Sequence, residues 1–280
     1  MPYTAEISRN NPSCFLFLID QSASMADPYQ SLAKPKSEAL ADVINRMLQQ
    51  LVIKCAKSEG IRDYYHVGVI GYGDKGVRPA FSGHLSGKLL APVSEIASHP
   101  ARIESRTKKV PDGAGGLVDL SVKFPIWFDG VANGGTPMTA AFKEANTIIE
   151  DWVRTNPYCF PPVVIHVTDG ESTDGDPTAE MSRLTVQSSN DGNVLLFNLH
   201  TNARSVNPLS FPGPGTVLPD AYAEMLFRGA SVLPGFMRQV ASQEFGLNLS
   251  EGAKAFVLNG DIDLIISAID IGTRPSLQLR

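Results

Sequence analysis

Residues 14–25 constrain the fold most strongly, because six consecutive apolar residues run directly into a polar turn. The apolar run at 14–19 shows no polar alternation and is too short to span a bilayer. Such a run is typical of a strand that is buried on both faces in the middle of a parallel sheet. Asp20, Ser22 and Ser24 follow it at alternate positions. Three oxygen-bearing side chains are therefore expected where an inner strand ends.

The chemistry of these three side chains has two interpretations. Carboxylate and hydroxyl oxygens are hard ligands that suit Mg²⁺, Ca²⁺ or Mn²⁺ better than the metals that favour Cys or His. The same residues also suit an Asx or Ser turn that leads into a helix. This stretch by itself leaves both interpretations open.

Strands and helices are predicted to alternate along most of the chain. Apolar residues recur at helical spacing over 40–55 and 138–152, with Gly60 expected to stop the first of these helices. Thr136 is expected to be the N-cap and Pro137 the first residue of the second. Further strands are predicted at 64–72, 77–82, 163–168, 193–200 and 254–259. A short helix is expected after Pro177, and others at 221–227, 234–245 and 261–271. His166 lies inside one of these strands and is expected to be a packed core histidine.

This alternation predicts the fold class. Parallel strands need crossover connections, and the crossover helices cover both faces of the sheet. We therefore expect an α/β protein with a Rossmann-like, doubly wound, mostly parallel sheet. The whole chain, 1–280, is expected to be a single domain with an insertion at about 83–132. Within the insertion we expect one or two irregular strands, packed on the main domain by Phe124, Ile126 and Trp127.

Composition limits the kinds of partner and the compartment. The 280 residues are 43 % hydrophobic and 19 % charged, with a formal net charge of -5. The densest basic patch, 102–109, also contains Glu104, which argues against nucleic acid as the main partner. No signal peptide and no membrane-spanning segment are recognisable. Cys14 and Cys55 are expected to be buried thiols, and the three cysteines, with Cys159, show no metal-binding spacing, which fits a reducing, cytoplasmic setting.

Two later stretches favour the metal-binding interpretation. Thr136 follows a Gly-Gly turn, and Asp169 follows the apolar strand at 163–168. Ligands of open α/β sheets bind at the carboxyl ends of the strands, where the strand order reverses. If the strands that precede Asp20 and Asp169 flank that point, the oxygens of all three stretches converge in one crevice.

This set of residues resembles the metal-ion-dependent adhesion site (MIDAS) of the von Willebrand factor A (vWA) domain. The family motif is Asp-x-Ser-x-Ser, a distant Thr and a distant Asp that is usually followed by Gly. The chain supplies Asp20, Ser22 and Ser24, then Thr136 in Gly-Gly-Thr-Pro and Asp169 in Thr-Asp-Gly. The resemblance covers roughly residues 13–272, and the long segment before Thr136 is a departure from it.

The resemblance implies a function and a set of ligands. Asp20, Ser22, Ser24, Thr136 and Asp169 would hold Mg²⁺, with Mn²⁺ or Ca²⁺ as substitutes. The cation would dock an Asp or Glu carboxylate of a protein partner, so the protein would be a binding module and not an enzyme. The bacterial, stand-alone, cytoplasmic members that it resembles most work in multi-protein stress or resistance systems. Asp74 and Asp129 are candidates for outer groups that hold metal-bound water, and solvated loop acids are the simpler interpretation of both.

Two other functions remain open at this stage. The alternative is a Mg²⁺-dependent phosphoryl-transfer or hydrolytic α/β enzyme, with Asp20 as nucleophile and Glu171 as the nearest candidate acid. The sequence contains no P-loop and no nucleophile elbow, and Glu171 suits a plain loop acid better. Nucleotide binding through the turn at 71–73 lacks the glycine fingerprint of dinucleotide sites.

Overall fold

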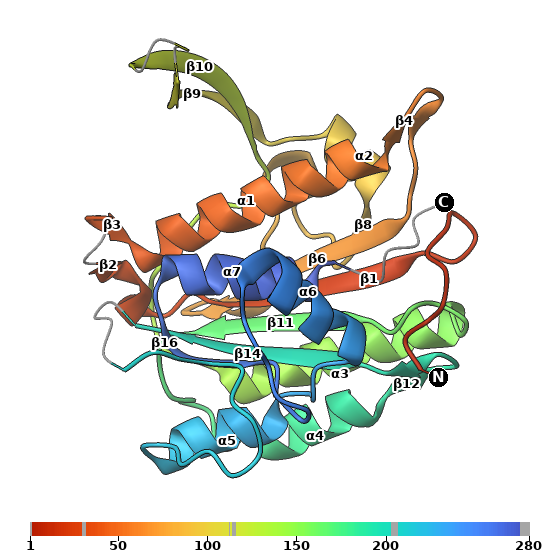
Figure 1. The fold of residues 1–280 in the computed structure, drawn as a ribbon, viewed down its shortest axis with the longest axis vertical. Coiled ribbons are helices and arrows are strands. Elements are labelled where there is room, and N and C mark those ends of the chain that lie inside the picture. Colours follow the sequence, from red (N-terminus) through yellow and green to blue (C-terminus); the bar gives the residue numbers. More distant parts are fainter. Residues whose placement is uncertain (1, 30–31, 112, 114–115, 203–206, 275–280) are drawn as a thin grey trace.

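The computed structural model describes residues 2–29, 32–111, 113, 116–202 and 207–274. They form a mixed α/β fold around one large, mostly parallel sheet of eight strands (Figure 1). In spatial order the strands are β15 (Leu209–Ser210), β16 (Phe256–Gly260), β14 (Leu195–Thr201), β11 (Val163–Thr168), β1 (Ser13–Asp20), β6 (Tyr65–Gly73) and β7 (Gly76–Pro79), with β8 (Ala91–Pro92) also paired to β6.

The remaining elements are helices and short strand pairs. The helices are α1 (Lys36–Cys55), α2 (Val93–Ser98), α3 (Met138–Thr155), α4 (Thr178–Val186), α5 (Ala221–Gly229), α6 (Gly235–Phe245), α7 (Ile262–Gly272) and the 3₁₀ turns η1 (Ala23–Ala26) and η2 (Gly83–Leu85). Two-residue strands pair as β2 (Pro28–Tyr29) with β3 (Lys34–Pro35), β4 (Ala56–Lys57) with β5 (Gly60–Ile61), and β12 (Ser188–Ser189) with β13 (Gly192–Asn193). A search of the described residues finds no helix with the length and apolar character that crossing a membrane requires.

The strand order reverses beside β1. The chain runs from β1 to its neighbour β6, and then crosses to the opposite side of β1 to form β11, β14 and β16 in turn. All four of these pairings are parallel, and the edge strands β7 and β15 are antiparallel. The expected edge strand at 77–82 is therefore confirmed as an edge strand, although it ends at Pro79. The reversal places the ends of β1 and β11 side by side.

Helices cover both faces of the sheet because alternate residues of β1 enter two separate cores. Phe15, Phe17 and Ile19 pack with α1, α6 and α7, whereas Cys14, Leu16 and Leu18 pack with α3, α4 and α5. Figure 1 shows these two helix layers on opposite sides of the sheet. The predicted buried face of α3 is confirmed from Met138 to Trp152, and all three cysteines are buried and free.

The segment at 83–132 differs from the prediction of irregular strands. β9 (Arg102–Pro111) and β10 (Leu117–Ile126) are ten residues each and pair in regular antiparallel register as a hairpin. The hairpin projects beyond α1 (Figure 1). Phe124, Ile126 and Trp127 are buried at its base, as expected.

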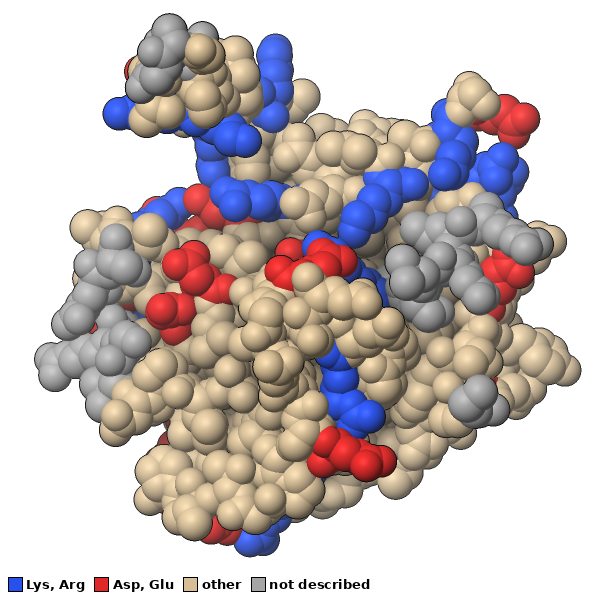
Figure 2. Space-filling model, viewed as in Figure 1, with Lys and Arg blue, Asp and Glu red and all other residues tan. Residues whose placement is uncertain are grey.

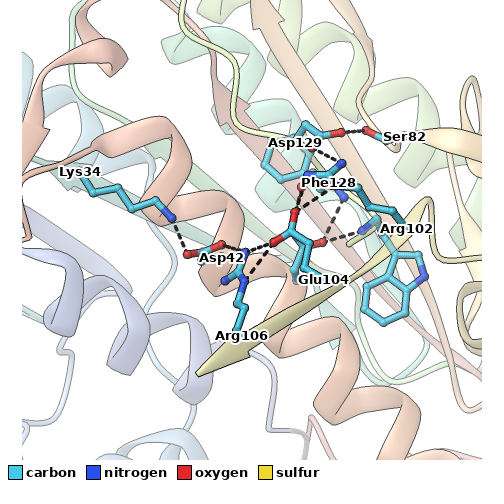
Figure 3. Close-up of polar contacts among 10 residues, drawn as sticks. Lys34, Asp42, Ser82, Arg102, Glu104, Arg106, Phe128 and Asp129 are labelled. Atoms are coloured by element: carbon cyan, nitrogen blue, oxygen red, sulfur yellow. Dashed lines mark hydrogen bonds and ion pairs between the residues drawn. The ribbon is translucent and has the colours of Figure 1, made fainter. Parts of the chain in front are cut away.

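An ion pair fixes the base of the hairpin to α1, and a second ion pair links it through Asp129 to a hydrogen bond at the start of η2 (Figure 3). Arg106 lies 2.9 Å from Asp42 and 2.8 Å from Glu104. Arg102 lies 2.7 Å from Asp129, which also accepts a 2.6 Å hydrogen bond from Ser82. Figure 2 shows Lys and Arg side chains gathered over the hairpin and α1 on that face. Because these two arginines already pair with carboxylates, they are poorly placed to bind phosphates.

The end of α1 corrects a second prediction. The helix stops at Cys55, and Ala56 is already extended. Gly60 lies in the small β4–β5 hairpin that follows, with a φ of 118° that favours glycine. Gly60 therefore forms a hairpin and does not end the helix.

His166 is a packed core histidine, as predicted. Asn198 Nδ2 donates to Leu226 O at 2.7 Å, so its Oδ1 faces His166 Nδ1 at 3.0 Å and accepts the Nδ1 proton. Nε2 is then free to accept a 2.7 Å hydrogen bond from the Tyr72 hydroxyl. Burial lowers the pKa of His166 to about 4, although the bond to Asn198 opposes this shift. The ring is therefore neutral at pH 7.

We expect His166 to contribute to acid sensitivity. Its folded pKa lies below the ordinary value of 6.5, so stability is present above pH 6.5 and is lost as the pH falls towards 4. Between pH 7 and 4.5 this contribution amounts to about 2–3 kcal/mol of unfolding free energy. Urea titrations of wild type and His166→Gln at both pH values measure it. Equal losses of stability in the two proteins would contradict the assignment.

Candidate metal centre

The parallel pairing of β1 with β11 places the two acidic residues. Ile19 is opposite Val167 in this register, so Asp20 ends one strand beside Thr168, and Asp169 follows directly. The turn at η1 then carries Ser22 and Ser24. The structure thus brings together two segments that are almost 150 residues apart in the chain, at the point where the strand order reverses.

Asp20 is held by hydrogen bonds to both carboxylate oxygens. Its Oδ1 accepts the Ser22 amide at 2.8 Å, and its Oδ2 accepts the Thr168 hydroxyl at 2.7 Å. The side chain has no exposed surface. Burial raises the pKa of Asp20 to about 6, and the bonds from Ser22 and Thr168 limit this rise. A nearby cation would favour the ionised form.

A continuous chain of oxygen contacts joins the two strand ends. The hydroxyl oxygens of Ser22 and Ser24 lie 3.1 Å apart. The Ser24 hydroxyl donates a 2.7 Å hydrogen bond to Asp169 Oδ1. Ser22 is buried and Ser24 is exposed, so the cluster opens to solvent on the Ser24 side.

Thr136 reaches the same cluster from a third loop. A Cβ placed on Gly170 would lie 3.9 Å from both Thr136 Oγ1 and Ser24 Oγ, so both hydroxyls lie beside Gly170. The Ala23 amide donates to Gly134 O at 3.0 Å, which ties this loop to η1. The five residues predicted from the sequence therefore lie in three neighbouring loops at the ends of β1 and β11.

Thr136 does not cap α3, which corrects the sequence-based prediction. The helix begins at Met138, its N-cap residue is Pro137, and no side chain of that residue closes the turn. Asp174 caps the helix from a distance, because it accepts the Thr139 amide at 2.9 Å and the Ala140 amide at 2.8 Å. Burial raises the pKa of Asp174, but these amide bonds outweigh it and the pKa lies below the usual value.

The two acids considered as outer groups differ in position. Asp129 belongs to the ion-pair network at the base of the hairpin. Asp74 is exposed and accepts a 2.8 Å hydrogen bond from Asn133, in the loop that leads to Thr136. Gly134 has a φ of 83°, and a Cβ there would lie 2.5 Å from Asp74 atoms, so only glycine permits this close approach. Asp74 thus lies at the edge of the cluster and Asp129 does not.

Three residues at the site were not predicted. Thr168 anchors Asp20, and the Tyr222 hydroxyl donates to Gly170 O. Lys36 Nζ lies 2.5 Å from Asp169 Oδ2. The tripeptide Thr168-Asp169-Gly170 offered a signal for the first of these, because a hydroxyl precedes the acid. No sequence pattern links Lys36 or Tyr222 to the site, because tertiary packing alone brings them there.

The residues present fit a hard divalent cation. The donor set consists of hydroxyl and carboxylate oxygens and contains no sulfur or imidazole. Asp169 Oδ2 lies 2.5 Å from Lys36 Nζ, so Oδ1, which accepts the Ser24 hydroxyl, is the carboxylate oxygen that faces the other candidate ligands. Mg²⁺, Mn²⁺ and Ca²⁺ all match this set.

A different cluster lies away from this site. His84, Glu95 and His99 place one ligand atom each within 4.8 Å of one another. The two imidazole rings stack face to face, with centroids 4.1 Å apart and planes at 16°, so their in-plane lone pairs do not converge. Glu95 also pairs with Lys88 at 2.5 Å. This arrangement does not identify a metal.

Comparison with known proteins gives little further information. No family model matches the chain, and no curated protein matches it significantly. Proximal thread matrix protein 1 from the mussel byssus is similar in structure, with 15 % identity and a TM-score of 0.40 over 82 % of this chain and 43 % of that one. The pilus adhesin of Streptococcus pneumoniae has 14 % identity and a TM-score of 0.32 over 60 % of this chain and 22 % of that one. The chain spans less than half the length of either, and similarities of this size support no functional argument.

We expect Asp174→Ala to destabilise the protein by about 1 kcal/mol, because it removes the acceptor for two amides at the start of α3. Glu171→Ala is the matched control, since Glu171 is exposed in the same loop. Urea unfolding at pH 7 measures both variants. If they unfold at the same urea concentration, Asp174 does not act as the cap.

Proposed function

We propose that this protein is a metal-dependent protein-binding module of the vWA type with a Rossmann-like fold. Asp20, Ser22, Ser24, Thr136 and Asp169 would form its MIDAS-type site. The observation that carries the proposal is the chain of hydrogen bonds at the strand-order reversal: the Ser22 amide donates to Asp20, and the Ser22 and Ser24 hydroxyls link on to Asp169. A solvated turn would not require residues from three loops to meet at the ends of β1 and β11.

Each residue has a role that follows from its position. The hydroxyls of Ser22, Ser24 and Thr136 are neutral ligands, whereas Asp20 and Asp169 supply negative charge directly or through bound water. Thr168 orients Asp20, and Tyr222 holds the Gly170 carbonyl beside the site. Mg²⁺, when bound, would offer an open position to an Asp or Glu carboxylate of a partner.

The surroundings provide a surface for a protein partner. Ser24, Asp74, Asn133 and Glu171 are exposed around the site, while Met25 is fully buried and lies beneath it. A groove of about 740 Å³ adjoins Glu171 and Tyr222 and continues along α5 to Arg228. A stable interface buries at least about 1,000 Å², so these loops would supply most of the contact area.

The cellular setting is part of the proposal and rests on the family resemblance alone. The bacterial members that this chain resembles act in the cytoplasm, in multi-protein stress or resistance systems. We propose the same setting, with a protein as partner and with no role for nucleic acid or a membrane.

The enzyme alternative receives less support from the site. Among the described residues, the histidines close to it are already engaged at both ring nitrogens. His166 bonds to Tyr72 and Asn198, whereas His200 Nδ1 accepts the Asn259 amide at 3.2 Å and the ring also bonds to the Asp169 backbone. Neither is free to activate a nucleophile or water. Release of phosphate from aryl phosphates that requires Mg²⁺ and disappears in Asp20→Ala would favour the enzyme instead.

We expect one Mg²⁺ or Mn²⁺ to bind per chain. Calorimetry should show that the Asp20→Ala, Asp169→Ala double variant loses binding, because both charged ligands are removed. A Glu150→Ala, Asp151→Ala double variant, which removes two exposed acids from α3, controls for the change in net charge. Equal affinities in the double variant and wild type would exclude the site.

We expect partner binding to need both the metal and the Thr136 hydroxyl. Proteins captured from native lysate in Mg²⁺ should be released by EDTA and should not bind Thr136→Ala, while Thr136→Ser should retain them. The captured partner is then purified and titrated, with each of its surface carboxylates neutralised in turn. A partner that binds equally well in EDTA would place the contact elsewhere, with the β9–β10 hairpin as the next surface to test.

A further inference from the structure

Lys36 occupies an unusual position for a lysine. It is the first residue of α1 and only 4 % exposed. Its Nζ lies 2.5 Å from Asp169 Oδ2, and the two side chains are 5 % and 1 % exposed. Lysine normally keeps its ammonium group in water, so this burial needs an explanation.

Helix stability does not account for this placement. The start of a helix carries partial positive charge, so a cation there is unfavourable. Removing an ammonium group from water is also costly, and the ion pair with Asp169 offsets that cost without a net gain over apolar packing. The position of Lys36 therefore points to a role in the charge of the site.

Asp169 divides its two oxygens between different neighbours. Oδ1 accepts the Ser24 hydroxyl at 2.7 Å and so faces the proposed ligands. Oδ2 faces Lys36. The ammonium group therefore contacts Asp169 through the oxygen that Ser24 does not use, and it can remain there while Oδ1 serves the cation.

We propose that Lys36 sets the net charge of the metal site, so that the cation is held less tightly but attracts a partner carboxylate more strongly. This inference rests on the proposed function. Asp20 and Asp169 supply two negative charges, and Lys36 cancels one of them. A divalent cation then leaves the site with one net positive charge, whereas without Lys36 the site would be neutral. The excess positive charge is what an incoming Asp or Glu would meet.

The proposal predicts opposite changes in two affinities when Lys36 is neutralised. Lys36→Met keeps the length and apolar stem of the side chain and removes its charge. Calorimetry with Mn²⁺ should show at least about tenfold tighter binding, because a unit positive charge close to the cation is removed. Lys36→Arg should remain within about threefold of wild type, since it keeps the charge.

The second affinity is that of a carboxylate for the bound metal. With Mn²⁺-loaded protein, water-proton relaxation reports the exchange of a metal-bound water for acetate, the probe used here. Acetate should bind Lys36→Met several-fold more weakly than wild type, and Lys36→Arg about as well as wild type. N-methylacetamide, which is neutral, should show no difference between the variants.

Lys34→Met is the matched control. It removes a lysine only two residues away that pairs with Asp42 and is 33 % exposed, so it changes the net charge equally without touching Asp169. Both of its affinities should equal those of wild type. Circular dichroism spectra and urea unfolding establish that every variant is folded, and Lys36→Gln serves as a second neutral variant if Lys36→Met is not.

The outcomes separate this inference from the proposed function. If wild type binds no Mn²⁺, or if acetate displaces no water from bound Mn²⁺, the proposed function fails. If wild type does both, but neutral variants of Lys36 leave both affinities unchanged or move them in the same direction, the role of Lys36 is refuted. A structural role alone would lower both affinities together.

Discussion

The parallel pairing of β1 with β11 is the constraint on which the rest of the structure depends. It joins the two halves of the sheet where the strand order reverses, and it brings Asp20 next to Thr168 and Asp169. Both strands are buried on both faces, so a one-residue shift of register would move the side chains of one core into the other, where they do not fit. Packing of the core thereby holds the polar residues at the two strand ends at hydrogen-bonding distance from one another.

The two acids at the strand ends each have polar or charged partners that compensate for their burial. Asp20 is stabilised by the Ser22 amide and the Thr168 hydroxyl, and Asp169 by the Ser24 hydroxyl and the Lys36 ammonium group. The core therefore tolerates two acids before any metal binds, because each has polar neighbours. For this reason we expect the fold to survive metal removal, unlike small domains that fold only around a metal.

Helix α1 connects the metal centre to the projecting hairpin. Lys36 at its first position contacts Asp169, while Asp42 pairs with Arg106 of β9. One turn further on, Asn45 Oδ1 accepts the Trp127 amide at 2.8 Å, and Nδ2 donates to Phe128 O at 2.7 Å. A rigid helix thus fixes the base of the hairpin relative to the site. The hairpin also exposes Leu117 and Leu120, which makes it a second candidate contact surface.

The sequence alone determined the alternation of strands and helices, the two buried strands that end in acids, the buried face of α3 and the five candidate ligands. These features depend on local apolar patterns and on short motifs, which a sequence displays directly. The cap of α3 by Asp174, the hairpin at 102–126 and the contact of Lys36 with Asp169 were decided by the tertiary structure. The cap and the lysine contact join residues that no local pattern relates: Asp174 caps a helix 34 residues earlier, and Lys36 meets an acid at the end of β11. β10 does show the apolar alternation of a strand, with Val118, Leu120 and Val122 placed between polar residues, whereas β9 is mostly polar and shows no such pattern. The regular pairing of the two as a hairpin is what the structure added, because backbone hydrogen bonds do not depend on side-chain pattern.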